Sequence, residues 1–430
     1  ASASGCQCLG HRFTRLLLEK LPLFALSAAS CAVTLLAQQI AIAPSTRFSL
    51  ATRIGNALVS YVTYLGQSLY PVGLALYYPH PQDNGNLPLW QVVAAAVLLA
   101  AISAAVFVVR RNYPYLLVGW LWYLGMLVPV IGLVQVGDQA HADRYTYLPH
   151  VGLAIMLAWS AQAACHWLGK HGVIGDWSIF RPNDVLAADR PQAENMDLSP
   201  FSRPLCATAS ALVLALLMGL AWRQAGFWRD SETLWNHTLA CTTRNATAHN
   251  NLGTVLRQSG RIAEALQQFH RALRIRPESA EIYSNLGSAF AISGHTAEAL
   301  VYCQRAIQIK PDYAEGHYNL GNALFAAGRA PEAIDHFRQA IRLKAEYGAA
   351  YNNLAAVLCT SGRTAEAIPE YQHALAIQPD CAEAHYNFGK ALLELGRTAE
   401  ALGHFQNALP LAETAGNGPL AAACRRELER

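Results

Sequence analysis

The sequence predicts an all-α protein in two parts, a polytopic helical membrane domain followed by an α-solenoid of helical hairpins. Of its 430 residues, 53% are hydrophobic and only 14% are charged, whereas about a quarter of the residues in an ordinary globular domain are charged. The second half instead repeats itself with a period of 34 residues, as repeat solenoids do. Charged residues become frequent after Trp222, so we place the boundary of the membrane domain (residues 1–222) there.

Five uncharged runs of the membrane domain are long enough to cross a bilayer. A crossing helix needs about 20 mostly apolar residues, because its backbone polar groups must be hydrogen-bonded within the helix. The run 54–78 is also uncharged, but polar residues and Pro71 interrupt it, so we expect it to be interfacial or re-entrant. The five predicted spans, each without Asp, Glu, Lys or Arg, are 21–43, 89–109, 114–134, 148–168 and 204–222.

Basic residues near the spans predict the orientation, because cytoplasmic loops are enriched in Lys and Arg. With five crossings, nine of these residues fall on one side and three on the other. A sixth crossing would move the Arg110-Arg111 pair to the poorer side. We therefore expect a cytoplasmic N-terminus and an extracytoplasmic repeat half, in a bacterial inner membrane or in the endoplasmic reticulum of a eukaryote.

The composition also argues against several classes of partner and site. The net charge of +3 favours no polyanionic partner, so we expect no nucleic acid. The ten cysteines are scattered without paired C-x-x-C units, which indicates neither a zinc site nor a disulfide framework. No cofactor is evident. The chain begins without Met, and we expect it to be a fragment.

Each 34-residue unit predicts two helices. An Asn-Leu-Gly triplet or a close variant lies in the first helix, and a glycine eight residues after its middle residue can end that helix in the left-handed conformation. Small alanines then recur in the second helix and allow close approach. A proline that ends the second helix follows in three units, while Ala345 and Glu413 replace it in the third and last units. These prolines are Pro277, Pro311 and Pro379.

This pattern resembles the tetratricopeptide repeat, and the resemblance covers five units over residues 246–413. It implies a right-handed solenoid with a concave groove. The preceding junction, 223–245, has a degenerate half-repeat as one interpretation. The final segment, 414–430, suits a polar capping helix.

Five asparagines stand at one position of the first helices, which line the groove of such solenoids. A carboxamide both donates and accepts hydrogen bonds, so a ladder of them can hold the backbone of an extended peptide. The alternative is that they only support helix packing. The candidate peptide-binding residues are Asn251, Asn285, Asn319, Asn353 and Asn387.

The histidines of the repeats suggest a metal site, but packing or groove lining is the better interpretation. Histidines that recur one repeat apart on stacked helices lie too far apart to share one ion. They are His249, His317 and His385 at one repeat position, with His270, His336, His373 and His404 elsewhere.

The predicted outer loop 137–149 is unusually dense in functional side chains. An arginine there can bind a lipid phosphate and an aspartate can orient a hydroxyl group. The alternative is that Asp143 pairs with Arg144 or a neighbour while the tyrosines form an interfacial belt. The candidate lipid-phosphate or donor residues are Asp138, His141, Asp143, Arg144 and Tyr145.

The segment Asp-Arg-Tyr-Thr-Tyr-Leu-Pro at 143–149, with Val-Pro-Val at 128–130, resembles a motif of tetratricopeptide-bearing GT-C membrane glycosyltransferases. Segments 64–71 and 74–79 resemble the same family, whose eukaryotic members are lumenal protein O-mannosyltransferases. The resemblance implies a polyprenyl-phosphate sugar donor, inversion at the sugar, and a polypeptide acceptor held by the repeats beside the lipid bilayer.

The sequence departs from this family in the first outer loop. The family's key acidic residues are expected there, but from Pro44 no acidic residue occurs before Asp83. The chain has about half as many predicted spans as members of this family. It therefore has no counterpart of their N-terminal catalytic half, and we assign no catalytic residue. The chain is either part of a protein glycosyltransferase or a non-enzymatic membrane scaffold whose repeats recruit partner proteins.

Overall fold

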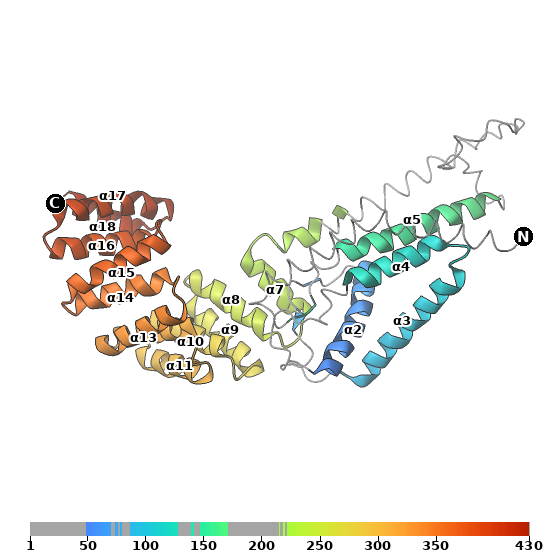
Figure 1. The fold of residues 1–430 in the computed structure, drawn as a ribbon, viewed down its shortest axis with the longest axis horizontal. Helices are drawn as coiled ribbons and strands as arrows, with labels where there is room; N and C mark the ends of the chain where they lie inside the picture. Colours follow the sequence, from blue (N-terminus) through green and yellow to red (C-terminus); the bar gives the residue numbers. More distant parts are fainter. Residues whose placement is uncertain are drawn as a thin grey trace, which may run out of the picture. The chain divides into compact units, whose positions relative to one another are not determined.

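The computed structural model divides into two compact units, Ala1–Arg244 and Asn245–Arg430, each described by itself (Figure 1). Within the described residues the fold is helical apart from one short ladder of two strands. The described residues are 49–69, 74–75, 78–79, 87–127, 139–141, 147–170, 215, 218–219 and 222–429.

The first unit is built around a helical hairpin, α3 and α4, with α5 lying along α4 (Figure 1). In the described part of the chain, one helix, α3, is long and apolar enough to cross a membrane. It coincides with the predicted span 89–109. The predicted span 21–43 and residues 128–134 lie outside the described residues, as does most of 204–222, so five crossings stay a prediction. The helices are α2 (Leu50–Leu69), α3 (Leu89–Val109), α4 (Pro114–Leu127), α5 (Tyr147–Lys170) and α7 (Ser231–Cys241).

Two glycines allow α4 and α5 to touch through their backbones. A Cβ atom on Gly119 would lie 2.5 Å from the carbonyl oxygen of Gly152, and one on Gly152 would lie 2.4 Å from the carbonyl oxygen of Gly119. Any larger residue at either position would therefore separate the helices. Close contact through small residues is typical of helix packing in membranes.

Helix α2 packs on the hairpin at one end. Gly55 lies against Val92 near the start of α3, and Tyr64 shares a buried cluster with Leu127 at the end of α4. These two helix ends lie on the same side of the hairpin because α3 and α4 run antiparallel. The Tyr61 hydroxyl donates a 2.7 Å hydrogen bond to the Leu124 carbonyl and fixes this arrangement.

The ladder joins two segments that the sequence separates by about 60 residues. Strand β1 (Tyr78–Pro79) pairs antiparallel with β2 (Gln139–His141), and Tyr78 lies opposite His141. The all-α prediction did not include this ladder. Its formation places Tyr78 and Pro79 beside residues 139–141 of the predicted outer loop 137–149.

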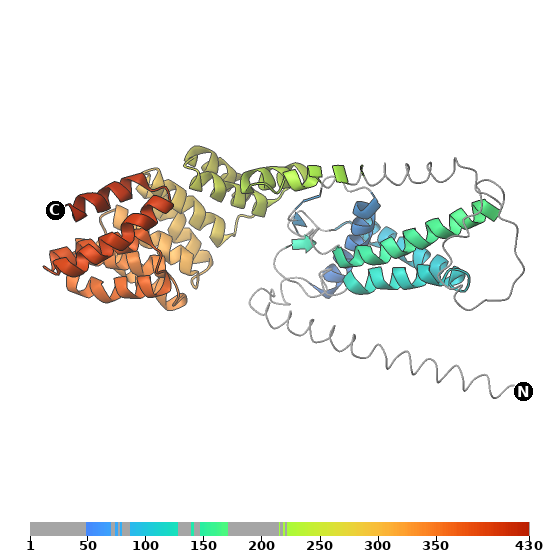
Figure 2. The ribbon, with the colours of Figure 1, turned by 90° about the horizontal axis from the view of Figure 1, so that it is seen from above.

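The second unit consists of five antiparallel helical hairpins and a last helix (Figures 1 and 2). The first helices are α8 (Ala246–Gln258), α10 (Ala280–Ile292), α12 (Ala314–Ala326), α14 (Gly348–Thr360) and α16 (Ala382–Glu394). The second helices are α9 (Ile262–Ile275), α11 (Thr296–Ile309), α13 (Ala330–Leu343), α15 (Thr364–Ile377) and α17 (Thr398–Thr414), followed by α18 (Gly418–Leu428). The predicted hairpin solenoid is confirmed.

Glycine ends every first helix, as its conformational freedom predicts. These five glycines have φ between +73° and +79°. Proline is less decisive at the ends of the second helices. Helix α13 ends at Leu343 although Ala345 replaces the proline, whereas α17 continues to Thr414 and contains Pro410. The five glycines are Gly260, Gly294, Gly328, Gly362 and Gly396.

The triplet glycine makes room for the aromatic residue of the second helix. A Cβ atom on Gly321 would lie 2.8 Å from the ring of Phe337, and Gly253 and Gly389 stand in the same relation to Phe269 and Phe405. The three rings are fully buried. The core of each hairpin is thus set by a local pair of residues, which explains why the 34-residue period reports the fold so directly.

Candidate peptide-binding groove

The first helices border a hollow of about 580 Å³ in the middle of the repeat array, residues 246–413. Side chains of α8, α10 and α12 line it, together with the residues that precede α12 and α14. Two of the predicted peptide-binding asparagines, Asn285 and Asn319, are among them. We refer to this hollow as the groove.

The asparagine ladder connects neighbouring units. The Asn285 amide nitrogen donates to Asn250 Oδ1 over 2.9 Å, and Asn319 donates to the hydroxyl of Ser284 over 2.8 Å. Asn353 Nδ2 likewise donates to Asn322 Oδ1 over 2.8 Å. The amide nitrogens of Asn319 and Asn353 each have a second acceptor, the Ser284 carbonyl and the Tyr318 hydroxyl. A primary amide has two N–H donors, so Asn285, with one contact, keeps a donor. The ladder therefore supports packing between units, and its contact with a peptide stays a prediction.

The remaining two ladder residues differ in their contacts. Asn387 reaches the preceding unit through a longer bond, 3.4 Å, to Asn352 Oδ1. Asn251 belongs to the first repeat of the array and is partly buried on α8. The ladder is thus tightest where the groove lies.

Two tyrosines form one wall of the groove from an unusual position. Asn245 and Ser279 cap α8 and α10, because their side chains accept hydrogen bonds from backbone N–H groups of the first turn. Tyr313 and Tyr347 occupy the same repeat position before α12 and α14 and make no cap bond. Losing a polar cap costs a helix about 1 kcal/mol. The exchange places aromatic rings in the groove instead.

A third tyrosine completes the wall. The ring centroid of Tyr318 lies 5.0 Å from that of Tyr347. Gly316 leaves space for Tyr313, since a Cβ atom there would lie 2.9 Å from its ring. Burial raises the pKa of both Tyr313 and Tyr347, and the nearby Glu315 carboxylate adds to the rise. Both phenols therefore stay neutral hydrogen-bonding groups over a wide pH range.

Arg257 contributes a positive charge from the end of α8. Its Nε atom is buried and has no hydrogen-bond partner among the residues the structure describes. Burial lowers the pKa of this guanidinium, although an arginine remains charged at any physiological pH. A buried donor without a partner is unfavourable. By contrast, the Glu315 carboxylate, which also lines the groove, already has a partner, since Lys344 Nζ lies 3.3 Å from its Oε1 atom.

Two histidine pairs join the helices within single units, which the sequence alone did not predict. His317 Nδ1 lies 3.0 Å from His336 Nδ1, and His385 Nδ1 lies 3.0 Å from His404 Nδ1. His249 contacts Gln268 at the same repeat positions. The recurring separation of 19 residues is the signal that could have revealed these pairs. Within the described residues, no group of three His, Cys, Asp or Glu side chains forms a metal site.

The tautomers of the first pair follow from its neighbours. His317 Nε2 lies 2.9 Å from the Pro311 carbonyl, which can only accept. The neutral His317 ring therefore donates from Nε2 and accepts at Nδ1, so His336 must donate from its Nδ1. The second pair has the same geometry, with His385 Nε2 2.9 Å from the Pro379 carbonyl. If both rings of a pair were protonated, each Nδ1 would carry a hydrogen, and the two N–H groups would point at each other without an acceptor.

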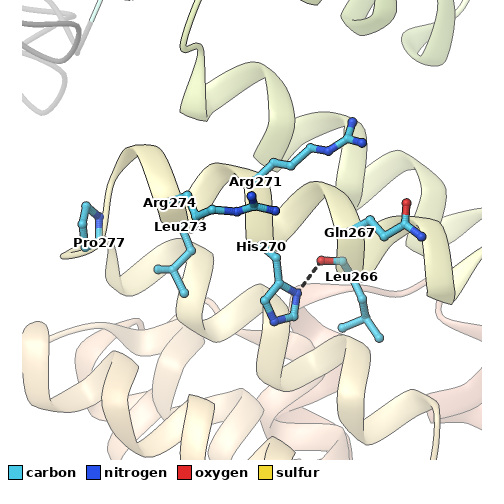
Figure 3. A pocket seen from close by; sticks show the side chains of 7 residues that line it. All are labelled: Leu266, Gln267, His270, Arg271, Leu273, Arg274 and Pro277. Atoms are coloured by element: carbon cyan, nitrogen blue, oxygen red, sulfur yellow. Dashed lines mark hydrogen bonds between the residues drawn. The ribbon is translucent and has the colours of Figure 1, made fainter.

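A second hollow lies on α9 and is not part of the groove. Its lining residues all come from α9 and the linker after it (Figure 3). His270 Nδ1 bonds the Leu266 carbonyl over 2.7 Å, so part of its polar lining is already used. Arg271 and Arg274 lie beside it and provide exposed basic residues for comparison with Arg257.

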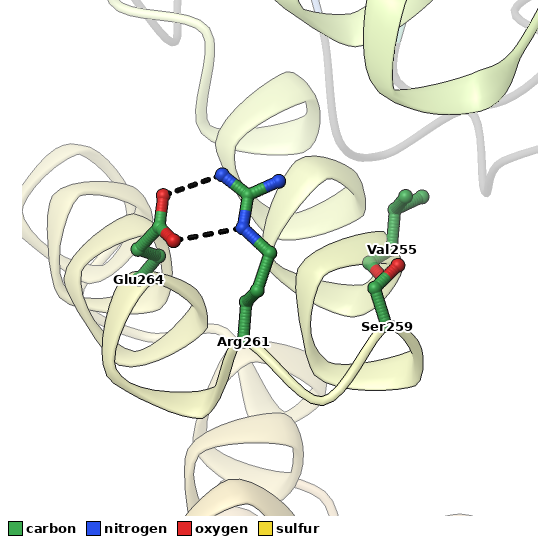
Figure 4. A network of polar contacts seen from close by, with 4 residues as sticks. All are labelled: Val255, Ser259, Arg261 and Glu264. Carbon is green, nitrogen blue, oxygen red and sulfur yellow. Dashed lines mark hydrogen bonds and ion pairs between the residues drawn. The ribbon is translucent and has the colours of Figure 1, made fainter.

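Each of four second helices begins with the same ion pair. Arg261 contacts Glu264 through two bonds of 2.7 and 2.6 Å (Figure 4). Both side chains are about half exposed. Exposed pairs of this kind contribute roughly 0–1 kcal/mol, so they support helix starts and not a binding site. The equivalent pairs are Arg329–Glu332, Arg363–Glu366 and Arg397–Glu400.

In the first unit, the candidate loop is described only in part. Of its five candidate residues, the backbone of His141 is placed, in β2 opposite Tyr78. Asp138, Asp143, Arg144 and Tyr145 lie outside the described residues.

The segment beside β1 is held by two other elements. The Leu74 carbonyl lies 2.9 Å from His237 Nε2 of α7 and accepts a 3.3 Å bond from Gln224 Nε2. The Tyr78 hydroxyl accepts bonds from Gln67 Nε2 of α2 and from the Ala75 backbone N–H. The β1–β2 ladder is therefore anchored to both α2 and α7.

Several solved structures resemble part of this chain. No curated protein matches the chain. Solved structures that resemble it include the tetratricopeptide protein TTC0263 of Thermus thermophilus, with 24% identity, a TM-score of 0.40, and coverage of 43% of this chain and 100% of that one. MamA is 27% identical, with a TM-score of 0.33 and coverage of 39% and 97%. YrrB, described as a tetratricopeptide protein with an unusual peptide-binding site, is 20% identical, with a TM-score of 0.33 and coverage of 43% and 93%.

The tetratricopeptide repeat model matches four overlapping windows, 244–312, 278–346, 312–380 and 346–414. These windows contain all five predicted hairpins. Residues 244–414 are therefore an array of tetratricopeptide repeats.

Proposed function

We propose that the groove binds an extended segment of another polypeptide. The observation that carries this proposal is the hollow itself, which spans consecutive first helices and is lined by amide, hydroxyl and guanidinium side chains. Solenoids use their concave surface for binding in this way. The Asn285 amide, which donates one hydrogen bond to Asn250, retains a second N–H donor for a peptide backbone.

A substitution that fills the groove tests this proposal. Ser288 lines the hollow, and Ser288→Trp would place a large ring in it. The full chain in mild detergent would be titrated into fluorescein-labelled peptides of about 12 residues, with polarisation as the readout. We expect Ser288→Trp to weaken binding by at least about tenfold, the effect of losing about 1.4 kcal/mol. Gln267→Trp, on the exposed surface of α9, is the matched control and should bind as the parent does. Equal binding by Ser288→Trp would contradict the proposal.

We further infer that the chain belongs to a membrane-embedded protein glycosyltransferase of the GT-C type, which uses a polyprenyl-phosphate sugar. The motif at 143–149 motivates this inference. The pairing of β1, which lies in the family-like segment 74–79, with residues 139–141 just before the motif favours it. In such an enzyme the repeats hold the polypeptide acceptor near the outer membrane surface. The competing function is a non-enzymatic scaffold in the membrane whose groove recruits partner proteins.

Membrane topology separates these functions. Sealed membranes would be treated with an impermeant maleimide, and labelled sites would be identified by mass spectrometry. The native Cys381 and a Gly85→Cys variant should react from outside, whereas Asp189→Cys should be protected. A cytoplasmic repeat array would contradict the glycosyltransferase function, because acceptor and donor would then face opposite sides of the membrane. The scaffold would remain.

A further inference from the structure

The three tyrosines and Arg257 give the groove a chemical preference beyond general peptide binding. Tyr313, Tyr318 and Tyr347 present aromatic surface at its middle, and Arg257 presents a cation from the neighbouring first helices. Tyr313 and Tyr347 are specific to this part of the array. The other linkers carry Asn245, Ser279 and Cys381 where the tyrosines stand.

The charged side chains around the groove differ in whether they already have a partner within the protein. Lys344 lies 3.3 Å from Glu315 and also 4.8 Å from the ring centroid of Tyr347, so both members of that ion pair are engaged. Lys310 lies 5.6 Å from the ring centroid of Tyr313. No described carboxylate perturbs the pKa of Arg257, which burial alone lowers. An incoming anion that reaches the terminal guanidinium nitrogens would therefore compete with no described carboxylate.

The tyrosine wall selects the second feature of a ligand. Tyrosine rings provide large apolar faces at a low cost in conformational freedom. Aromatic pairs favour offset or edge-to-face contact, and all three tyrosines line the hollow. An aromatic or large aliphatic side chain fits this surface better than a small polar one.

We propose that the groove selects acidic segments in which a carboxylate side chain binds Arg257 and a nearby aromatic or large aliphatic side chain packs on Tyr313, Tyr318 and Tyr347. The occupant is an extended polypeptide, and the proposal rests on the peptide-binding function of the groove. A guanidinium binds a carboxylate through two parallel hydrogen bonds, which gives direction as well as affinity. Neutral peptides bind the same groove more weakly.

Matched peptides would test the preference with the full chain in detergent. The base peptide is a neutral Ser/Gly/Gln peptide of the same length, and the acidic peptides add one Asp and one Phe separated by two, four or six residues. Companion peptides replace Asp by Lys, or Phe by Ser. We expect the best acidic peptide to bind at least about tenfold more tightly than both companions, since a charged hydrogen bond is worth about 1.5–3 kcal/mol.

Variants assign the effect to the proposed residues. Arg257→Gln should remove the preference for Asp over its Lys companion, and Arg257→Glu should reverse that preference in favour of Lys. Tyr313→Ser with Tyr347→Ser, which copies Ser279 of another linker, should remove the preference for Phe. Arg274→Gln, on α9 outside the groove, is the control. Helical circular dichroism establishes that each variant is folded.

The outcomes distinguish this inference from general peptide binding. If all peptides bind with equal affinity and Ser288→Trp abolishes binding, the selectivity is wrong and the groove function stands. If Arg274→Gln changes the preference as much as Arg257→Gln does, the assignment to Arg257 is wrong. If no peptide binds, both proposals are wrong.

Discussion

Single residues carry much of the geometry of this array, and the turn glycines show it most directly. Gly328 has φ of +75° and open space around its Cα, so a Cβ atom would meet no neighbour. The cost of Gly328→Ala is therefore conformational, about 1–2 kcal/mol for a left-handed residue. We expect the free energy of unfolding, measured with urea, to fall by that amount.

Gly403 supplies the matched control for this substitution. It lies inside α17, also in open space, but without a positive φ. Gly403→Ala should stabilise the array by roughly 0.5–1 kcal/mol, because alanine loses less conformational entropy in a helix. A loss of stability at both positions would show that the backbone argument is wrong.

The histidine pairs make stability depend on pH. Burial lowers the pKa of His336 and His404, and the neighbouring imidazoles His317 and His385 lower it further, while Glu332, Asp335 and Glu400 partly oppose this. The unfolded chain, with a histidine pKa near about 6.5, therefore binds more protons than the folded chain below that pH. The stabilisation is complete above about pH 6.5 and is lost as the pH falls below it.

A variant from within the array tests this dependence. Replacing His336 and His404 by Gln reproduces the His249–Gln268 contact of the first repeat. We expect the melting temperature of the parent to fall more between about pH 7.5 and about pH 5.5 than that of the double variant. Equal falls would mean that other groups determine the acid sensitivity.

At the scale of helices, side-chain caps determine where the array begins. Asn245 is fully buried and accepts a 2.9 Å bond from the Ala248 N–H at the start of α8. Asn245→Ala should lower the free energy of unfolding by about 1–2 kcal/mol, because it removes the cap. Cys381→Ala, at the same repeat position without a cap bond, should change it by less than about 0.5 kcal/mol. Chemical denaturation measures both, and equal effects would contradict the capping role.

Whole helices also show why α4 and α5 stay together. The paired contact of Gly119 and Gly152 requires small residues on both helices. Such close approach lets the two helices make many van der Waals contacts, which are individually weak and collectively large.

At the scale of the whole molecule, the division at Arg244 and Asn245 predicts that the repeats form an independent folding unit. Each hairpin buries its apolar face on its neighbours, and α18 covers the end of the array with Ala421 and Cys424. Residues 245–430 expressed alone should therefore be helical by circular dichroism and should melt cooperatively. A disordered fragment would show that the first unit is needed to complete the core.

Sequence periodicity was sufficient for the repeats because the residues that decide each hairpin lie close together in the chain. Gly321 and Phe337, for example, are separated by only 16 positions and contact each other directly. The helices of the repeats, their turns and the positions of the five candidate asparagines followed from this local pattern. The crossings of the membrane remain predictions from composition alone.

Other features required the tertiary structure. The bonds from Asn285 and Asn319 to preceding units, the buried Nε of Arg257, the tyrosine wall and the β1–β2 ladder all depend on residues from different elements. The sequence by itself determined the repeat, its boundaries and the position of each candidate asparagine, because those depend on local periodicity. Only the tertiary structure decided which side chains face the groove and which are already hydrogen-bonded, because that depends on how successive helices stack.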